Sequence, residues 1–101
     1  MAAAAPTDDS SDRMTPQEIE VAIREAMPLP VKSVMFLDEG SNIGVATNLD
    51  ARSVPGAEKA TMHVKFSVEK SATRQRVYQS IRTATTQVRI FIDQFTTRGG
   101  R

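Results

Sequence analysis

Apolar residues recur with a helical period in the segment that begins near residue 15. They occupy positions i, i+3, i+4, i+7 and i+8, which form one stripe on a helix: Ile19, Ala22, Ile23, Ala26 and Met27. Thr15 is a good N-cap, Pro16 suits the first helical position, and Glu18 completes a capping box. Pro28 and Pro30 cannot continue a helix. The pattern therefore predicts a helix between Thr15 and Pro28.

Three further segments contain the apolar and β-branched residues that are typical of strands. Residues 31–37 (VKSVMFL) form an apolar run before the turn-forming residues 38–42 (DEGSN), and we expect a well-buried strand there. In residues 61–69 alternate positions are apolar, which indicates a strand with one face on the core. Residues 88–95 (VRIFIDQF) are predicted to form the third strand.

Residues 43–58 allow two interpretations. Their apolar residues are consistent with a short strand, namely Ile43, Val45 and Leu49. Their Gly, Asn, Asp and Pro residues instead favour a long, mobile connection.

A second helix is predicted after Ser71, which can cap it. Its inward stripe consists of Val77, Ile81 and Ala84, and the threonines that follow are expected to fray its end. The order helix, strand, strand, helix, strand indicates a two-layer α+β fold with both helices on one face of a three-stranded sheet. We expect one domain over residues 15–96, a disordered N-terminal tail over 1–14 and a flexible C-terminal tail over 97–101.

The composition narrows the range of functions. The 101-residue chain has no Cys, which excludes disulfides, thiolate metal sites and thiol catalysis. No apolar run approaches the roughly 20 residues that span a bilayer, and three Asp residues follow the N-terminal alanines, which disfavours a targeting peptide. We expect a cytoplasmic or nuclear protein that does not contact membranes.

Charge is divided unevenly along the chain. Residues 1–50 hold nine Asp/Glu and three Lys/Arg, a net charge of −6, whereas residues 51–101 hold three Asp/Glu and ten Lys/Arg, a net charge of +7. This arrangement can attract an anionic partner, or it can hold one half of the fold against the other.

The basic half contains the candidate binding residues. Arg74, Tyr78 and Arg82 are spaced by four, so they form a stripe beside the apolar face of the second predicted helix, and Arg89 on the last predicted strand can extend it. Guanidinium groups beside an aromatic ring suit contacts to phosphates and stacked bases. The alternative is a solvated helix face on which these arginines pair with acids of the first helix, namely Glu18, Glu20 and Glu25.

No constellation for catalysis or metal binding is present in the sequence. His63 is the single histidine, and no patterned group of acids accompanies it to complete a metal shell. Asp38 and Glu39 are adjacent, so on a strand they point apart and do not form an acid–base pair. We therefore expect a protein that is not an enzyme and has no cofactor.

Three stretches resemble the BolA-like branch of the type II KH domains, together with the size and predicted order of elements. Val31–Gly40 is similar to the first strand of that family, His63–Phe66 to the second strand, and Val77–Ile81 to its following helix. The resemblance implies a small α+β domain that binds RNA or takes part in iron–sulfur trafficking with a glutaredoxin. The family's ligand histidine would fall at Arg89, and a guanidinium does not ligate iron.

Three functional hypotheses follow. The first is a protein-binding adaptor or a small subunit that uses a sheet edge or the basic helix. The second is an RNA-binding module of the KH-like kind, whose affinity would depend strongly on salt. The third is the BolA-like regulator or iron–sulfur partner that the resemblance implies.

Overall fold

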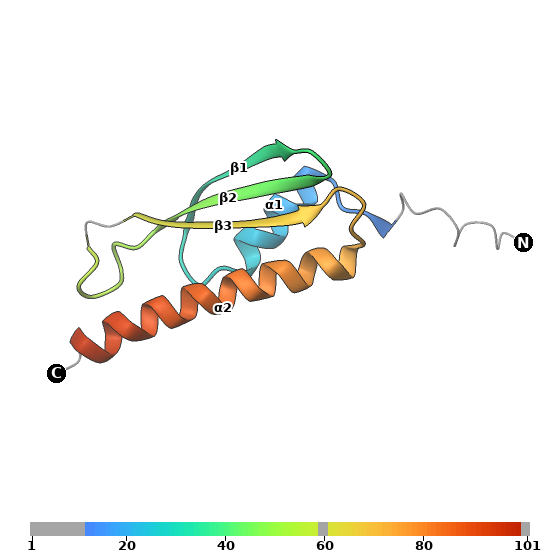
Figure 1. The fold of residues 1–101 in the computed structure, drawn as a ribbon. Coiled ribbons are helices and arrows are strands. Elements are labelled where there is room, and N and C mark those ends of the chain that lie inside the picture. The colour runs from blue at the N-terminus through green and yellow to red at the C-terminus, as the bar shows by residue number, and fades with distance from the viewer. Residues whose placement is uncertain (1–11, 59–60, 100–101) are drawn as a thin grey trace, which may run out of the picture.

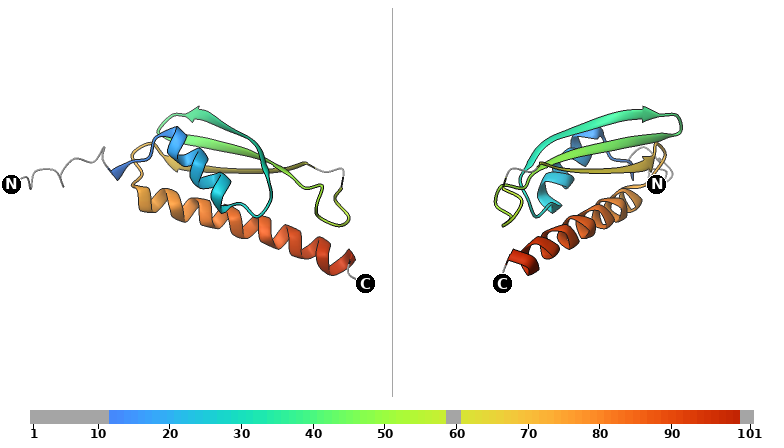
Figure 2. Two further views of the ribbon diagram at one scale, coloured as in Figure 1. Left: turned by 180° about the vertical axis from the view of Figure 1, so that it is seen from behind. Right: turned by 60° about the vertical axis from the view of Figure 1, so that its left-hand side comes forward.

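A three-stranded sheet with two helices on one face makes up the fold (Figure 1, Figure 2). The structure, a computed structural model, describes residues 12–58 and 61–99. Its elements in chain order are α1 (Pro16–Ala26), β1 (Val31–Glu39), β2 (Asn42–Asp50), β3 (Thr61–Glu69) and α2 (Arg74–Gly99). The sheet is antiparallel with the order β1-β2-β3. The expected two-layer α+β class is confirmed, whereas residues 1–11 and 100–101 of the predicted tails lie outside the described residues.

Helix α1 begins and ends as the sequence predicts. The Thr15 hydroxyl accepts a hydrogen bond from the Glu18 amide (3.1 Å), and the Glu18 carboxylate accepts one from the Thr15 amide (2.8 Å). The last turn is closed by the Met27 amide, which donates to the Ile23 carbonyl. The stripe of α1 packs into the core, where Ile19, Ala22 and Ile23 are buried.

A two-residue turn joins β1 to β2 and makes residues 42–50 the central strand. Gly40 has a φ of +78°, which suits the first central position of a type II′ hairpin turn, and Glu39 pairs with Asn42 across it. The short-strand interpretation of residues 43–58 is therefore right for β2, and the strand is longer than its three apolar residues suggest. Because β2 has a partner on both sides, Val45, Thr47 and Leu49 are fully buried.

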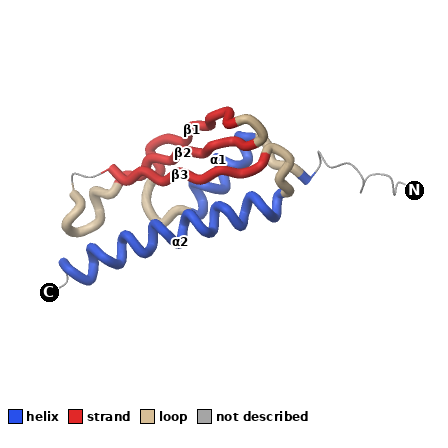
Figure 3. The backbone as a smooth tube through the Cα atoms, in the orientation of Figure 1, coloured by secondary structure: helices blue, strands red, loops and turns tan. Residues whose placement is uncertain are grey.

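Residues 51–58 form the remaining connection, which is anchored rather than loose. Its small apolar side chains enter the core: Ala51, Val54 and Ala57. The loop lies beside the C-terminal part of α2 (Figure 3). There Gly56, with a φ of +89°, leaves room for the Phe95 ring, which would be 3.0 Å from a Cβ atom at this position.

The third predicted strand, residues 88–95, is wrong, because this segment is the continuation of α2. Val88, Ile92 and Phe95 are spaced at i, i+4 and i+7, so they extend the buried stripe of the helix. Phe91 and Phe95 also pack together one turn apart, with ring centroids separated by 4.8 Å. The observed order is thus helix, strand, strand, strand, helix, and residues 97–99 of the predicted tail belong to α2.

The threonines in the middle of α2 do not fray it, contrary to expectation. Each hydroxyl donates to the carbonyl four residues earlier: Thr83 to Gln79, Thr85 to Ile81 and Thr86 to Arg82, at 2.9–3.1 Å. This pattern leaves no hydroxyl of the three without a partner and lets the helix continue. The helix has 26 residues, so it is about 39 Å long and extends beyond the sheet to the 51–58 loop.

Candidate functional site

The four residues that the sequence predicts for binding lie on one flank of α2. Arg74, Tyr78 and Arg82 are four residues apart, and Arg89 follows Arg82 by seven, so all four project within a quarter turn of one another. The prediction of Arg89 as a strand residue is wrong, but the long helix places it beside the others. The flank measures about 22 Å from Arg74 to Arg89 along the helix axis.

Arg74 is engaged by the N-terminal part of the domain. Its guanidinium lies 3.6 Å from the Glu18 carboxylate and donates to the Arg13 carbonyl at 3.5 Å. The pKa of Glu18 is lowered, first by the hydrogen bond from the Thr15 amide and then by the charge of Arg74. Pairing with an acid of α1 is therefore confirmed at this arginine.

The other acids of α1 behave differently. Glu20 pairs with Arg24 of its own helix at 3.0 Å, rather than with α2. In the described part of the chain, Arg82 and Arg89 make no ion pair within 4.0 Å, and both are exposed. The flank thus combines one neutralised arginine with two that are available to an anionic group.

A hollow of about 330 Å³ lies between α1 and the first turns of α2. Two exposed apolar side chains line it, Val21 (54% exposed) and Tyr78 (43% exposed). Acids of α1 and Arg74 form the rest of its wall, so the hollow is mixed in charge. It is open and lacks a cluster of groups for catalysis.

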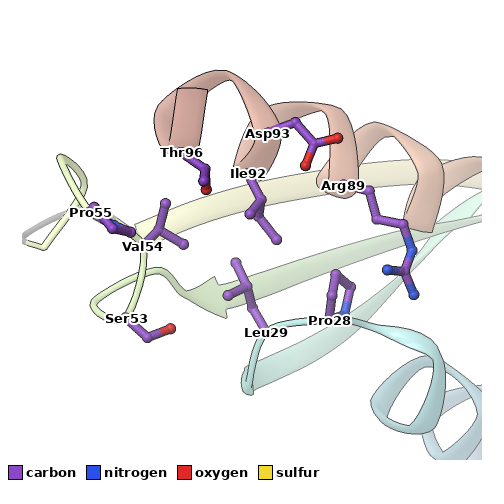
Figure 4. Close-up of a pocket in the computed structure, with 9 residues that line it drawn as sticks. All are labelled: Pro28, Leu29, Ser53, Val54, Pro55, Arg89, Ile92, Asp93 and Thr96. Carbon is purple, nitrogen blue, oxygen red and sulfur yellow. The ribbon is translucent and has the colours of Figure 1, made fainter. Parts of the chain in front are cut away.

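A second hollow, of about 410 Å³, lies further along the same flank (Figure 4). It is formed by the C-terminal part of α2, the 28–29 segment and the 53–55 segment. The Arg89 side chain lies beside Pro28 and extends away from Asp93, while Leu29 and Ile92 form the floor (Figure 4). The hollow therefore combines apolar and polar side chains, with the Arg89 guanidinium and the Asp93 carboxylate both in its wall.

His63 lies on the outer face of the sheet, where a polar side chain from each strand forms a row. Its Nδ1 is within hydrogen-bond distance of the Asn48 amide oxygen, and the Asn48 amide nitrogen donates to the Ser33 hydroxyl at 3.0 Å. No group of three His, Cys, Asp or Glu that can hold a metal occurs in residues 12–58 and 61–99. No helix among those residues is long and apolar enough to cross a membrane.

The first strand differs most from its prediction. Residues 31–37 are expected to be well buried, but β1 lies at the edge of the sheet and most of its residues are exposed. Met35 (58% exposed) and Leu37 (38% exposed) lie on the uncovered outer face, and Val34 and Phe36 on the inner face are only half-buried. In the described residues, the main chain of β1 receives one hydrogen bond from outside the sheet, from Arg24 to the Val31 carbonyl (3.0 Å).

The two edges of the sheet are not equivalent. Strand β3 has Lys65 in its middle, and α2 packs along it. Strand β1 has no charged residue from Ser33 to Leu37. Since charged residues and covering elements are the usual protection of an edge, β1 is the less protected one.

The hairpin end of β1 is held in place by ion pairs across the sheet. Glu39 lies 3.1 Å from the Lys65 ammonium and accepts a hydrogen bond from the Ser67 hydroxyl at 2.9 Å. It crosses β2 at Gly44, where a Cβ atom would be only 2.6 Å from its carboxylate. Asp38 likewise pairs with Lys70 at 2.9 Å. Both acids have a lowered pKa, chiefly because of the hydrogen bonds from these lysines.

Sequence reasoning missed the β1 edge because its exposure depends on strand order. An apolar run usually indicates a buried strand. Because residues 88–95 are helical and do not join the sheet, residues 31–37 have β2 as their single neighbour. The useful signal was the short spacing between this run and residues 42–50. A two-residue turn at Gly40 and Ser41 requires these two segments to pair.

Comparison of the chain with protein-family models, curated proteins and solved structures finds no match. The resemblance to BolA-like and KH-like domains therefore stays a prediction. Part of its basis was an order of elements that differs from the observed one, in which β2 lies between β1 and β3 and residues 88–95 belong to α2.

Proposed function

We propose that the protein is a binding module without chemistry of its own, and that β1 binds an extended segment of another protein chain. The observation that carries this proposal is the nine-residue strand β1 at the edge of the sheet. It has no charged residue from Ser33 to Leu37, and among the described residues no strand pairs with it on the side opposite β2. Addition of a strand to such an edge is a common mode of peptide recognition.

The main chain of β1 supplies the affinity in this mode. Glu39 pairs with Asn42 at the hairpin turn, so the main-chain groups of Glu39 face β2. Because this direction alternates along a strand, every second residue counted back from Asp38 directs its amide and carbonyl groups away from β2. These residues are Val34, Phe36 and Asp38. A bound segment would pair with them and continue the ladder.

The side chains of β1 supply the specificity. Met35 and Leu37 would contact apolar residues of the bound segment on the outer face, and Val34 and Phe36 would contact those on the inner face. The bound segment that fits is therefore apolar on both of its faces and has no charge in its middle.

A peptide-display selection on the full chain tests this proposal. We expect enriched peptides with β-branched and apolar residues, and we expect Met35→Lys to weaken their binding about tenfold or more, because it gives β1 the central charge that protects β3. Ile90→Lys is the matched control, since Ile90 is also an exposed apolar residue (53%) but lies on α2. No enrichment, or equal binding to the two variants, would refute the proposal.

Binding of single-stranded RNA by the α2 flank is a second candidate function. It is supported by the exposed guanidinium groups of Arg82 and Arg89 beside Tyr78, on a helix whose charge is mainly positive. We expect Arg74→Ala with Arg82→Ala to weaken RNA binding about tenfold or more at low salt without unfolding the domain. Arg76→Ala, on another face of α2, serves as the control. Unchanged affinity of the folded double variant would remove this candidate.

A further inference from the structure

We propose that the hollow at the C-terminal part of α2 binds a small aliphatic zwitterion, which has a carboxylate and an ammonium group at the two ends of a methylene chain. The hollow is formed by α2 and by the 28–29 and 53–55 segments (Figure 4). Its described lining contains no residue of β1, so this site is separate from the one proposed at the edge of the sheet.

Two opposite charges lie in the wall of this hollow without pairing. Arg89 and Asp93 are four residues apart on α2, yet no ion pair within 4.0 Å joins them among the described residues, and both are exposed. Side chains of a helix lean towards its N-terminus, so the long Arg89 side chain leads away from Asp93 (Figure 4). An acid that precedes a base by four residues pairs better than the reverse order, as Glu20 and Arg24 show on α1 at 3.0 Å. The hollow therefore presents a cation and an anion that are both open to a ligand.

An apolar floor lies beside these two charges. It is formed by Leu29, which is buried, and Ile92, which is half-buried (Figure 4). A methylene chain placed on this floor loses contact with water, which favours binding. A ligand that is charged at both ends and apolar in its middle therefore matches the hollow, whereas a ligand with one charge leaves either Arg89 or Asp93 without a partner.

The walls of the hollow are held in place by the core. Val54 is buried and anchors the 51–58 loop, and Pro28 and Pro55 have a fixed φ angle. These segments consequently have little freedom to lose when a ligand binds. The volume of about 410 Å³ is within the range of small-molecule sites.

The positions of the polar groups set the orientation of the ligand. Its carboxylate would pair with the Arg89 guanidinium beside Pro28, and its ammonium group with the Asp93 carboxylate. Thr96 follows Asp93 by three residues, so its hydroxyl can accept a second hydrogen bond from the ammonium group. Arg89 and Asp93 are the only charged residues in the described lining, so the hollow has no net charge and favours neither anions nor cations in general.

An amide NMR titration of the full chain with ε-aminocaproate, a linear zwitterion of this kind, tests the site. We expect saturable shifts in residues 28–29, 53–55 and 89–96, with a dissociation constant of about 1 mM, because the compound is small and both ion pairs are partly exposed. Shifts that are absent, or that do not approach saturation by about 20 mM, would overturn the inference.

Three related compounds separate the contributions of the two charges and the chain. Hexanoate lacks the ammonium group and hexylamine lacks the carboxylate, so each should bind about threefold more weakly through the loss of one exposed ion pair. Glycine has both charges but no methylene chain to bury, and it should bind about tenfold more weakly or worse. Equal affinity for ε-aminocaproate, hexanoate and hexylamine would mean that the contact is apolar only, which contradicts the zwitterion.

Two variants assign the charges to their residues. Asp93→Asn should remove the preference for ε-aminocaproate over hexanoate, and Arg89→Gln should remove the preference over hexylamine. Arg76→Gln is the matched control, because it makes the same change of charge on another face of α2 and should leave every affinity as it is. Survival of both preferences in the first two variants, or an equal loss of affinity in Arg76→Gln, would refute the assignment of this site.

Discussion

Thr47 provides the sharpest test of the described core. It lies in the middle of β2, only 1% exposed, between Val34 of β1 and Val64 of β3. Its hydroxyl has no hydrogen-bond partner among the residues that the structure describes. A buried hydroxyl without a partner costs about 1–3 kcal/mol of stability. Thr47→Val removes that hydroxyl, keeps the β-branched shape, and should raise the free energy of unfolding by about 1–2 kcal/mol.

Thr85 is the matched control, because it is also buried (8% exposed) but its hydroxyl donates to the Ile81 carbonyl at 2.9 Å. Thr85→Val removes a satisfied hydrogen bond, so it should lower the free energy of unfolding by about 0.5–1 kcal/mol. The same chemical change should thus have opposite signs at the two positions. Comparison of the two variants separates the hydrogen-bond effect from the general gain of an apolar methyl group.

Urea unfolding, followed by circular dichroism, gives both values. With a slope of about 1 kcal/mol per M for a domain of this size, the midpoint of Thr47→Val should rise by about 1–2 M. A midpoint at or below that of the wild type would contradict the assignment of Thr47 as an unpartnered core residue. Equal stabilisation by both variants would mean that burial of the methyl group, and not the missing partner, controls stability.

Three further predictions concern the ends of elements and the surface. Thr15→Ala removes half of the capping box of α1 and should lower the free energy of unfolding by about 1 kcal/mol in the same urea assay, whereas an unchanged value would mean that the cap is not formed in solution. The hydrogen bonds from Arg52 lower the pKa of Asp50 to about 2. The stability contributed by this carboxylate is therefore present above its ordinary pKa of 3.8 and is lost as the pH falls from there towards 2. A carboxyl-carbon NMR titration of Asp50 with a midpoint near 3.8 would refute this. Gly56→Ala forces a Cβ atom at positive φ to within 3.0 Å of the Phe95 ring and should cost about 1–3 kcal/mol in thermal unfolding, and a variant as stable as the wild type would show that the 51–58 loop is not fixed against α2.

Features set by neighbouring residues were predictable from the sequence. The capping box of Thr15 and Glu18 needs four residues, and it fixes the start of α1 without help from the rest of the fold. The turn at Gly40 and the alternation in residues 61–69 are equally local. The four-residue spacing of Arg74 and Tyr78 is likewise enough to place both side chains on one face of a helix.

Features set by tertiary partners were not predictable in the same way. In residues 88–95, Val88, Ile90 and Ile92 fit a strand, while Val88, Ile92 and Phe95 fit a helix. The helix forms because its apolar side chains pack beside the 51–58 loop, where Val54 is buried and Gly56 leaves room for the Phe95 ring. Exposure of β1 depends in turn on which strand fills the third place in the sheet.

Amide hydrogen exchange in β1, measured residue by residue by NMR, shows whether this edge binds a strand. With the edge free, the amides of Val34, Phe36 and Asp38 should exchange quickly, and those of Met35 and Leu37, which face β2, should be protected. Adding a selected peptide should protect the first three and leave the other two unchanged. Fast exchange of Val34 and Phe36 under all these conditions would contradict strand addition at β1.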